Sequence, residues 1–187
     1  EAYNLVSGVN DDFTVGIVLT YNPEADIEPD PVPARAKKVD GKVGLGIIGS
    51  GNFAKSVLVP AMTNTGGFDV RGVVSARGLS AEAMKEVTGA QYSATDAQTV
   101  IDDDSVDAVI IATRHDSHAG YVLEALKKDK HVFVEKPLCL TRDQLAEIEV
   151  AARASKGILM VGFNRRFSPF VTDIGAHFAE RSEPLAM

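Results

Sequence analysis

The chain has 187 residues, of which 45% are hydrophobic, and it carries a formal net charge of -7. This length allows one well-packed core with appendages and leaves little for a second domain. The acidic balance, with no run of Lys or Arg longer than two, argues against binding to nucleic acid or to an anionic membrane. The single Cys139 excludes an internal disulfide and a cysteine-based metal cluster. Because no signal-peptide pattern and no apolar stretch of the ~18 residues that span a bilayer are found, we expect a cytoplasmic protein.

The first 41 residues differ in character from the rest. Residues 13–21 alternate apolar and small polar side chains, which is the period of a strand. Residues 22–35 are rich in proline and acidic groups, a composition that favours an extended and solvated linker. We therefore expect residues 1–41 to be the end of a preceding domain, followed by a linker.

A glycine-rich turn follows the first strand of the main region. Residues 43–48 are apolar and lead into the pattern Gly-x-Gly-x-x-Ala, formed by Gly49, Gly51 and Ala54. In a dinucleotide fingerprint the first glycine permits a tight turn, the second lets a pyrophosphate approach the backbone, and the small third residue lets the helix pack closely. The phosphates then lie at a helix N-terminus, where the macrodipole favours negative charge. The alternative is a glycine-rich turn that binds nothing, as in many α/β proteins.

Short apolar runs alternate with amphipathic stretches from residue 42 onward, which is typical of βαβ units. We expect strands near 43–48, 69–75, 90–93, 107–112, 131–134 and 158–162, with helices between them. This rhythm predicts an α/β fold over residues 42–182: a doubly wound parallel sheet of six strands, the Rossmann fold, in the order 3-2-1-4-5-6. Such sheets bind ligands beyond the carboxyl ends of their strands.

Several helix boundaries are predicted from local patterns. Ser80 is expected to cap a helix, with Leu79 and Met84 as its hydrophobic staple, and Thr141–Gln144 to form a capping box. Gly157 is expected to end the helix before it.

The second strand ends at Ser75 and is followed by Arg77, where an acidic residue would bind the 2′-hydroxyl of the adenosine ribose. A hydroxyl and a cation instead suit a 2′-phosphate. This favours NADP over NAD. The alternative is that Arg77 is an ordinary solvated turn residue or stacks on adenine.

The fourth strand is followed by Arg114, His115 and Asp116, and then by Ser117 and His118. The spacing of the two histidines is not a recognised zinc arrangement, so we expect no metal. Ser117 is expected to cap the next helix and His118 to be structural. Arg114 and His115 are candidates for direct contact with the nicotinamide ribose.

The fifth strand ends in Glu135, Lys136 and Pro137. Opposite charges followed by proline at the end of a buried strand place an ion-pairing group at the mouth of the expected ligand pocket, beyond the carboxyl ends of the strands. Burial and the neighbouring charge can shift the pKa of a lysine there, which makes Lys136 a candidate proton donor or acceptor at the reacting carbon. The peptide bond before Pro137 is a candidate for the cis form. The alternative is a surface salt bridge at a strand end.

These motifs, together with residues 161–167, resemble in order and spacing the N-terminal half of the glucose-fructose oxidoreductase / inositol dehydrogenase family (Gfo/Idh/MocA). The resemblance covers residues 42–182, and Glu-Lys-Pro is its most specific element. It implies an NAD(P)-dependent oxidoreductase that acts on a sugar, a cyclitol or a related polyol. Residues 1–21 resemble the C-terminal end of a medium-chain alcohol dehydrogenase domain.

The resemblance also implies roles for individual residues. The pyrophosphate would be held by Gly49, Gly51, Asn52, Phe53 and Ala54. The adenosine ribose would face Ser75 and Arg77, and the nicotinamide ribose would face Thr113, Arg114 and Glu135. Lys136 would contact the reacting hydroxyl, while Asn164 and Arg165 would line the nicotinamide and substrate side.

Members of this family continue into a second domain with the remaining catalytic group, most of the substrate pocket and much of the oligomer interface. We expect residues 183–187 to be the start of such a domain, so that a homo-oligomer would form through it and this chain alone would be inactive. The alternative function is a dinucleotide-binding redox sensor without turnover. The retained Glu135 and Lys136 favour the enzyme.

Overall fold

The computed structural model describes residues 39–178. The predicted strand at 13–21, the linker at 22–35, the alcohol-dehydrogenase-like segment and residues 183–187 lie outside the described residues.

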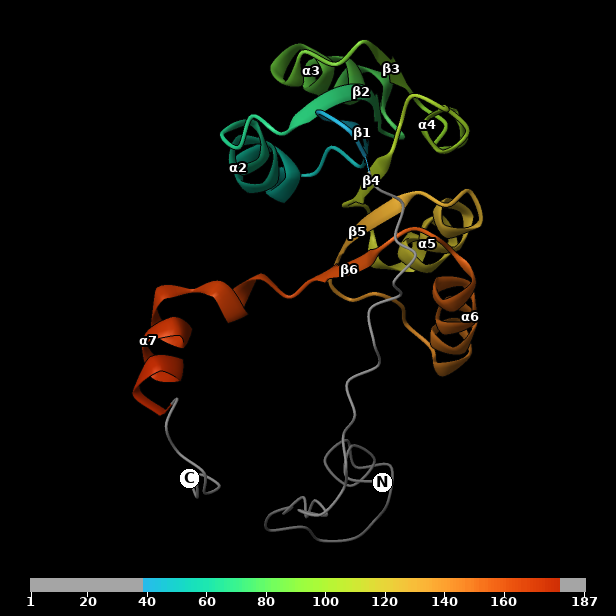
Figure 1. The fold of residues 1–187 in the computed structure, drawn as a ribbon. Coiled ribbons are helices and arrows are strands. Elements are labelled where there is room, and N and C mark those ends of the chain that lie inside the picture. The colour runs from blue at the N-terminus through green and yellow to red at the C-terminus, as the bar shows by residue number, and fades with distance from the viewer. Residues whose placement is uncertain (1–38, 179–187) are drawn as a thin grey trace, which may run out of the picture. The chain divides into compact units, whose positions relative to one another are not determined.

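Six strands form one parallel sheet in the order β3-β2-β1-β4-β5-β6, so the predicted topology is confirmed (Figure 1). The strands are β1 (Val43–Ile48), β2 (Phe68–Val74), β3 (Tyr92–Ala94), β4 (Ala108–Ile111), β5 (His131–Glu135) and β6 (Leu159–Gly162). Their ends differ from the predicted ranges by at most two residues. The central strands are β-branched and apolar, as expected for strands buried on both faces.

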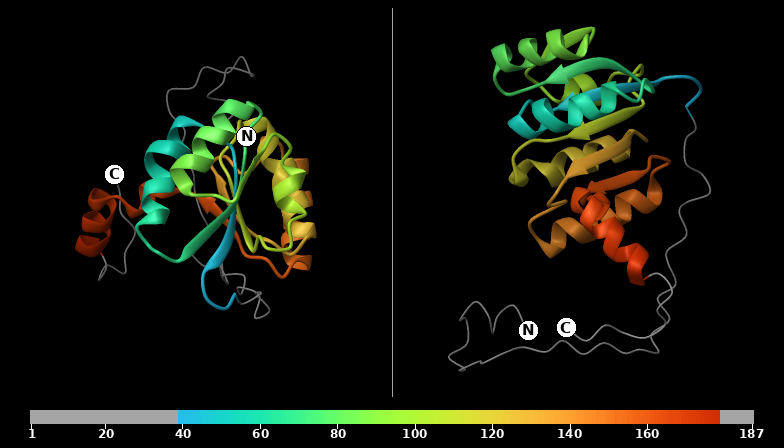
Figure 2. Two further views of the ribbon diagram at one scale, coloured as in Figure 1. Left: turned by 90° about the horizontal axis from the view of Figure 1, so that it is seen from above. Right: turned by 90° about the vertical axis from the view of Figure 1, so that its left-hand side faces the viewer.

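Helices cover both faces of the sheet (Figure 2). On one side lie the π-helical segment η1 (Ala54–Leu58), α2 (Val59–Thr63) and α3 (Gly78–Thr88). On the other side lie α4 (Gln98–Ile101), α5 (His118–Lys127) and α6 (Arg142–Ala154). The chain continues through the 3-10 turn η3 (Asn164–Phe167) into α7 (Pro169–Phe178), whose Phe170, Val171 and Ile174 are exposed.

Two apolar clusters form the core, one on each face of the sheet. Ile48, Val109, Ile111 and Val134 face α4, α5 and α6, where Val122 and Ile148 are buried against them. Leu45, Ile47 and Val73 face the other way and pack with Ala54, Val59 and Met84. Alternate residues of one strand thus belong to opposite clusters, because side chains alternate across a strand.

The structure confirms one predicted helix boundary and overturns two. Thr141 and Gln144 form the expected capping box at the start of α6. Ser80 does not cap α3, because that helix begins two residues earlier and the Arg77 carbonyl accepts from the backbone N–H of Ser80. The staple is also absent: Met84 is fully buried, whereas Leu79 is 90% exposed.

Gly157 does not end α6, which stops at Ala154 with Ser155 as its extended C-cap. Gly157 is instead required by packing, since a Cβ there would overlap the carbonyl oxygen of Lys130. None of the helices between residues 39 and 178 combines the length and the apolar character of a transmembrane span.

Candidate functional site

The predicted site residues gather along one edge of the sheet. All strands are parallel, so their carboxyl ends lie at the same edge. Five loops lie side by side at this edge, because neighbouring strands end together. The last paired residues are Ile48 with Val74, Ile48 with Ile111, and Glu135 with Gly162. Ser75 follows β2 and Glu135 ends β5, two strands that are three spacings apart, roughly 14 Å.

The two glycines of the turn after β1 have different surroundings. Gly49 has a φ of +106° and donates its N–H to Val74 at 2.8 Å, which joins the turn to the end of β2. A Cβ on Gly49 would overlap the carbonyl of Ala112. A Cβ on Gly51 would meet only the Ala112 oxygen, at 3.9 Å, and otherwise open space. Gly49 is therefore required by the fold, whereas Gly51 leaves an open cradle beside the backbone.

A helical segment starts directly after this cradle, at Asn52 and Phe53, which are both exposed. The Gly51 carbonyl accepts from Lys55 N–H at 3.1 Å, while the N–H groups of a first helical turn have no intrahelical acceptor. Ala54 is buried against β1, so the close packing of helix on strand is present. This end of the helix offers unpaired donors and a favourable dipole to an anion in the cradle.

A polar pair lies at the end of β2. The Ser50 hydroxyl donates to the Ser75 hydroxyl at 2.8 Å, linking the glycine turn to the second loop. Arg77 precedes α3 and is exposed. The sequence reasoning missed Ser50, whose only signal was a hydroxyl inside the glycine turn.

The loop after β4 is held by hydroxyl groups. Thr113 Oγ1 and Ser117 Oγ lie 2.6 Å apart, and Ser117 also donates to the Arg114 carbonyl at 2.8 Å. Ser117 thus stands at the N-cap of α5 but its side chain does not cap it, which corrects the expected role. Arg114 and His115 are exposed.

His118 is wholly buried at the first position of α5. Its Nδ1 lies 2.7 Å from the Pro137 carbonyl oxygen and its Nε2 lies 3.2 Å from the Thr113 carbonyl oxygen. The ring of His115 lies edge-on to it, with 5.8 Å between centroids. Among residues 39–178, no group of three or more His, Cys, Asp or Glu side chains could hold a metal ion.

The end of β5 carries an incompletely partnered carboxylate. Burial raises the pKa of Glu135, although a hydrogen bond from the Lys136 backbone N–H and the Lys136 charge oppose this. Its Oε1 is buried without a hydrogen-bond partner. A Cβ on Gly162 would lie 2.8 Å from that oxygen, so a glycine there makes room for it. Lys136 is exposed and is followed by a cis peptide bond to Pro137.

Asn164 and Arg165 lie in η3, just after β6 and beside Glu135 in strand order. Both are exposed. The neighbouring Arg166 stacks on the ring of Phe167, with 5.4 Å between guanidinium and centroid. These residues end the row of loops on the side away from Arg77.

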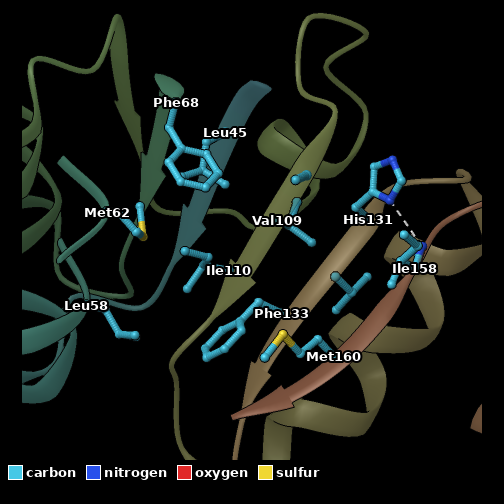
Figure 3. Close-up of a pocket in the computed structure, with 12 residues that line it drawn as sticks. Leu45, Leu58, Met62, Phe68, Val109, Ile110, His131, Phe133, Ile158 and Met160 are labelled. Atoms are coloured by element: carbon cyan, nitrogen blue, oxygen red, sulfur yellow. Dashed lines mark hydrogen bonds between the residues drawn. The ribbon is translucent and has the colours of Figure 1, made fainter. Parts of the chain in front are cut away.

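An apolar hollow of about 340 Å³ lies elsewhere, over the face of the sheet (Figure 3). It is lined by Leu45, Leu58, Met62, Phe68, Ala108, Val109, Ile110, His131, Val132, Phe133, Ile158 and Met160. His131 is already engaged, since its Nδ1 accepts from Ile158 N–H at 3.1 Å. This hollow offers few polar groups and is separate from the polar edge, so we do not assign the site to it.

Comparison with known proteins gives a consistent result. Residues 43–163 match the Gfo/Idh/MocA family, described as an oxidoreductase family with an NAD-binding Rossmann fold. Inositol 2-dehydrogenase 2 of Saccharopolyspora erythraea is 33% identical over 68% of this chain and 38% of its own length. The 1,5-anhydro-D-fructose reductase of Ensifer adhaerens is 35% identical over 61% of this chain and 34% of its own.

Among solved structures, a 3-ketoreductase from Actinomadura kijaniata, determined with NADP and TDP-benzene, superposes with a TM-score of 0.69. It is 26% identical and the match covers 75% of this chain and 43% of that one. The chain thus spans less than half of the length of each of these relatives.

Proposed function

Because this chain belongs to the Gfo/Idh/MocA family of NAD(P)-dependent oxidoreductases, we propose that the edge of loops described above binds the dinucleotide along its length. The open cradle at Gly51 carries this proposal. A side chain is excluded at Gly49 by the fold, but at Gly51 nothing in the described residues fills the space. A glycine that the fold does not need is expected where a ligand approaches the backbone.

The pyrophosphate is assigned to Gly49, Gly51, Asn52, Phe53 and Ala54. Gly51 lets it reach the backbone, and the unpaired N–H groups of the first helical turn donate to its oxygens. Ala54 contributes indirectly, because its small size keeps the helix close to β1.

The adenosine end is assigned to Ser75 and Arg77, with Ser50 orienting the Ser75 hydroxyl. A guanidinium and a hydroxyl at this place favour a 2′-phosphate, so we propose a preference for NADP(H). The bound NADP of the Actinomadura structure supports this choice.

The nicotinamide end is assigned to Thr113, Arg114, His115, Glu135, Asn164 and Arg165. The buried Glu135 Oε1 supports this assignment, since an unpartnered carboxylate oxygen can accept from a ribose hydroxyl.

Lys136 is assigned the role of acid–base group. The nicotinamide, when bound, supplies the acceptor or donor of a hydride. Lys136 Nζ would hold or release the proton of the reacting hydroxyl, because Lys136 follows Glu135 directly and is exposed at the same edge. The relatives that act on inositol or 1,5-anhydrofructose support a sugar, a cyclitol or a related polyol as substrate.

Calorimetric titration of the chain with NADPH and with NADH tests the proposal. We expect both cofactors to bind. The affinity for NADPH should exceed that for NADH about tenfold or more, which is the contribution of a charge-assisted hydrogen bond. Equal affinities would refute the cofactor preference, and binding of neither would refute the dinucleotide site. Absorbance of reduced nicotinamide over a panel of sugars and cyclitols then tests the substrate class.

A further inference from the structure

His118 is a buried polar side chain to which the proposed function gives no role. Its exposed fraction is 0%, so the side chain offers no surface to a ligand at the edge of loops. Each ring nitrogen approaches a backbone carbonyl of a different loop: Nδ1 at 2.7 Å from Pro137 and Nε2 at 3.2 Å from Thr113. Buried histidine nitrogens need partners, but here the partners are in the two loops that flank the proposed nicotinamide end.

The ladder between β4 and β5 ends at the pair Ile111 and Val134. Thr113 and Pro137 lie beyond that pair, so the ring of His118 bridges the two loops where the strands no longer do. Thr113 itself is held by Ser117, which makes the first loop a fixed support.

The two contacts are not equivalent. Carbonyl oxygens only accept, and a neutral imidazole has one N–H, so it donates to one of them. The shorter contact is the one to Pro137. We assign the N–H to Nδ1, the nitrogen with the shorter contact, so that His118 donates to the carbonyl of Pro137, the residue after Lys136.

We propose that His118 is a positioning residue: by donating to the Pro137 carbonyl it fixes the Glu135–Pro137 loop against the loop after β4. The inference rests on the proposed function, because it concerns where Glu135 and Lys136 stand relative to the nicotinamide. Loss of this bond lets the loop move and weakens the nicotinamide half of the site, while the adenosine half, formed by the loops after β1 and β2, is unaffected.

Two conservative variants separate the two contacts. The amide nitrogen of asparagine comes close to the position of Nδ1, and that of glutamine close to the position of Nε2. His118→Asn therefore retains the donor to Pro137, whereas His118→Gln places its amide nitrogen near the Thr113 carbonyl and loses the donor to Pro137. We expect His118→Gln to weaken NADPH binding about tenfold, the value of one hydrogen bond, and His118→Asn to restore most of that affinity.

The adenosine half is probed by 2′,5′-ADP, which lacks the nicotinamide. Its affinity should be the same for the unmutated chain and both variants. The emission of bound NADPH, which reports on the surroundings of the nicotinamide, should change in His118→Gln and not in His118→Asn.

Lys130→Met is a matched control for general loss of stability. Lys130 is also buried, and its Nζ donates to the carbonyls of Asp103 and Val106 at 2.7 and 2.6 Å, but it lies before β5, at the opposite end of that strand. This variant should lower the urea midpoint without changing NADPH affinity. All titrations are run where circular dichroism shows each variant folded.

The outcomes are distinct. Loss of NADPH affinity in His118→Gln alone, with 2′,5′-ADP unchanged, supports the positioning role. Equal loss in both variants, a parallel loss for 2′,5′-ADP, or no loss in either overturns it while leaving the dinucleotide site intact. Failure of the unmutated chain to bind NADPH or NADH overturns the proposed function itself.

Discussion

Gly49 and Gly51 stand two positions apart in one turn, yet a side chain at each would meet different surroundings. At Gly49 a Cβ overlaps the Ala112 carbonyl and the φ of +106° is strained for any L-residue. At Gly51 neither obstacle is present in the described residues. A substitution at Gly49 therefore tests what the fold requires, and a substitution at Gly51 tests what the ligand requires.

Gly51→Val is expected to abolish dinucleotide binding while the chain stays folded, because its side chain enters the open cradle. Calorimetry with NADPH and a urea denaturation curve measure the two effects. Gly49→Val is the control: it should lower the free energy of unfolding by several kcal/mol through backbone strain and overlap. Tight NADPH binding by Gly51→Val would place the phosphate site elsewhere.

Arg77→Ala is expected to remove the preference for NADPH over NADH. Its guanidinium is assigned to the 2′-phosphate, so NADPH affinity should fall about tenfold or more while NADH affinity stays the same. Arg71→Ala is the control, since it removes another arginine of the same segment. Arg71 lies in β2 and pairs with Asp69 at 3.1 Å. An equal loss for both cofactors in Arg77→Ala would mean that Arg77 stacks on adenine.

Glu135→Gln is expected to stabilise the chain at pH 7 in the absence of ligand. Burial raises the pKa of Glu135, so the folded state disfavours its charged form. The stability that this group contributes is fully present below its unfolded pKa of about 4.3 and is lost as pH rises through the folded pKa. The advantage of the glutamine should thus vanish in acid, as urea midpoints at pH 7 and pH 4 would show. An advantage of the same size at both values would contradict this.

Within single elements, sequence patterns predicted contacts correctly where the two contacting residues are close in the chain. The capping box of α6 is complete, with Gln144 N–H donating to Thr141 Oγ1 at 3.2 Å and Gln144 Oε1 accepting from Thr141 N–H at 3.3 Å. The same reasoning failed for α3, because the chain enters that helix from an extended Arg77 and Leu79 points to solvent. A staple needs the preceding residue to turn back over the helix, which depends on the path of the chain after β2.

Thr141→Ala is expected to lower the free energy of unfolding by about 1 kcal/mol, the usual weight of an N-cap. NADPH affinity should not change, because α6 packs against α5 and contains none of the residues assigned to the dinucleotide. Thr141→Ser, which keeps the acceptor, should recover most of the loss in a urea denaturation series. A loss as large in Thr141→Ser would assign the effect to the methyl group.

At the scale of the whole molecule, the sheet is covered unevenly. The face toward α4, α5 and α6 is buried across β1, β4 and β5. On the other face α2 and α3 cover the first half, and the hollow in Figure 3 lies over the rest, where Met160 is exposed. The groups that we assign to the dinucleotide lie at the polar edge and not in this hollow.

Dinucleotide binding should stabilise the whole domain. Because a ligand that binds only the folded state adds RT ln(1 + [L]/Kd), NADPH at a hundred times its Kd adds about 2.7 kcal/mol. For a chain of this size that corresponds to a rise in Tm of roughly 5–10 °C. Differential scanning fluorimetry measures it, with Gly51→Val as the control that should show no rise. A similar rise in that variant would mean that NADPH acts at another place.

The order of the strands and the row of candidate residues could be predicted from the amino-acid sequence. The period of the strands, the glycine turn and the alternation of strands with helices are all local patterns. Because the strands are parallel, the residues that follow them lie at one edge of the sheet. The folded structure was needed to show that the fold requires a glycine at Gly49 and leaves open space at Gly51. It also revealed the contact of Ser50 with Ser75 and the contacts of His118 with two loops. Each of these depends on atoms from segments that are distant in sequence or on the exact path of the backbone, which residue types and spacing do not encode.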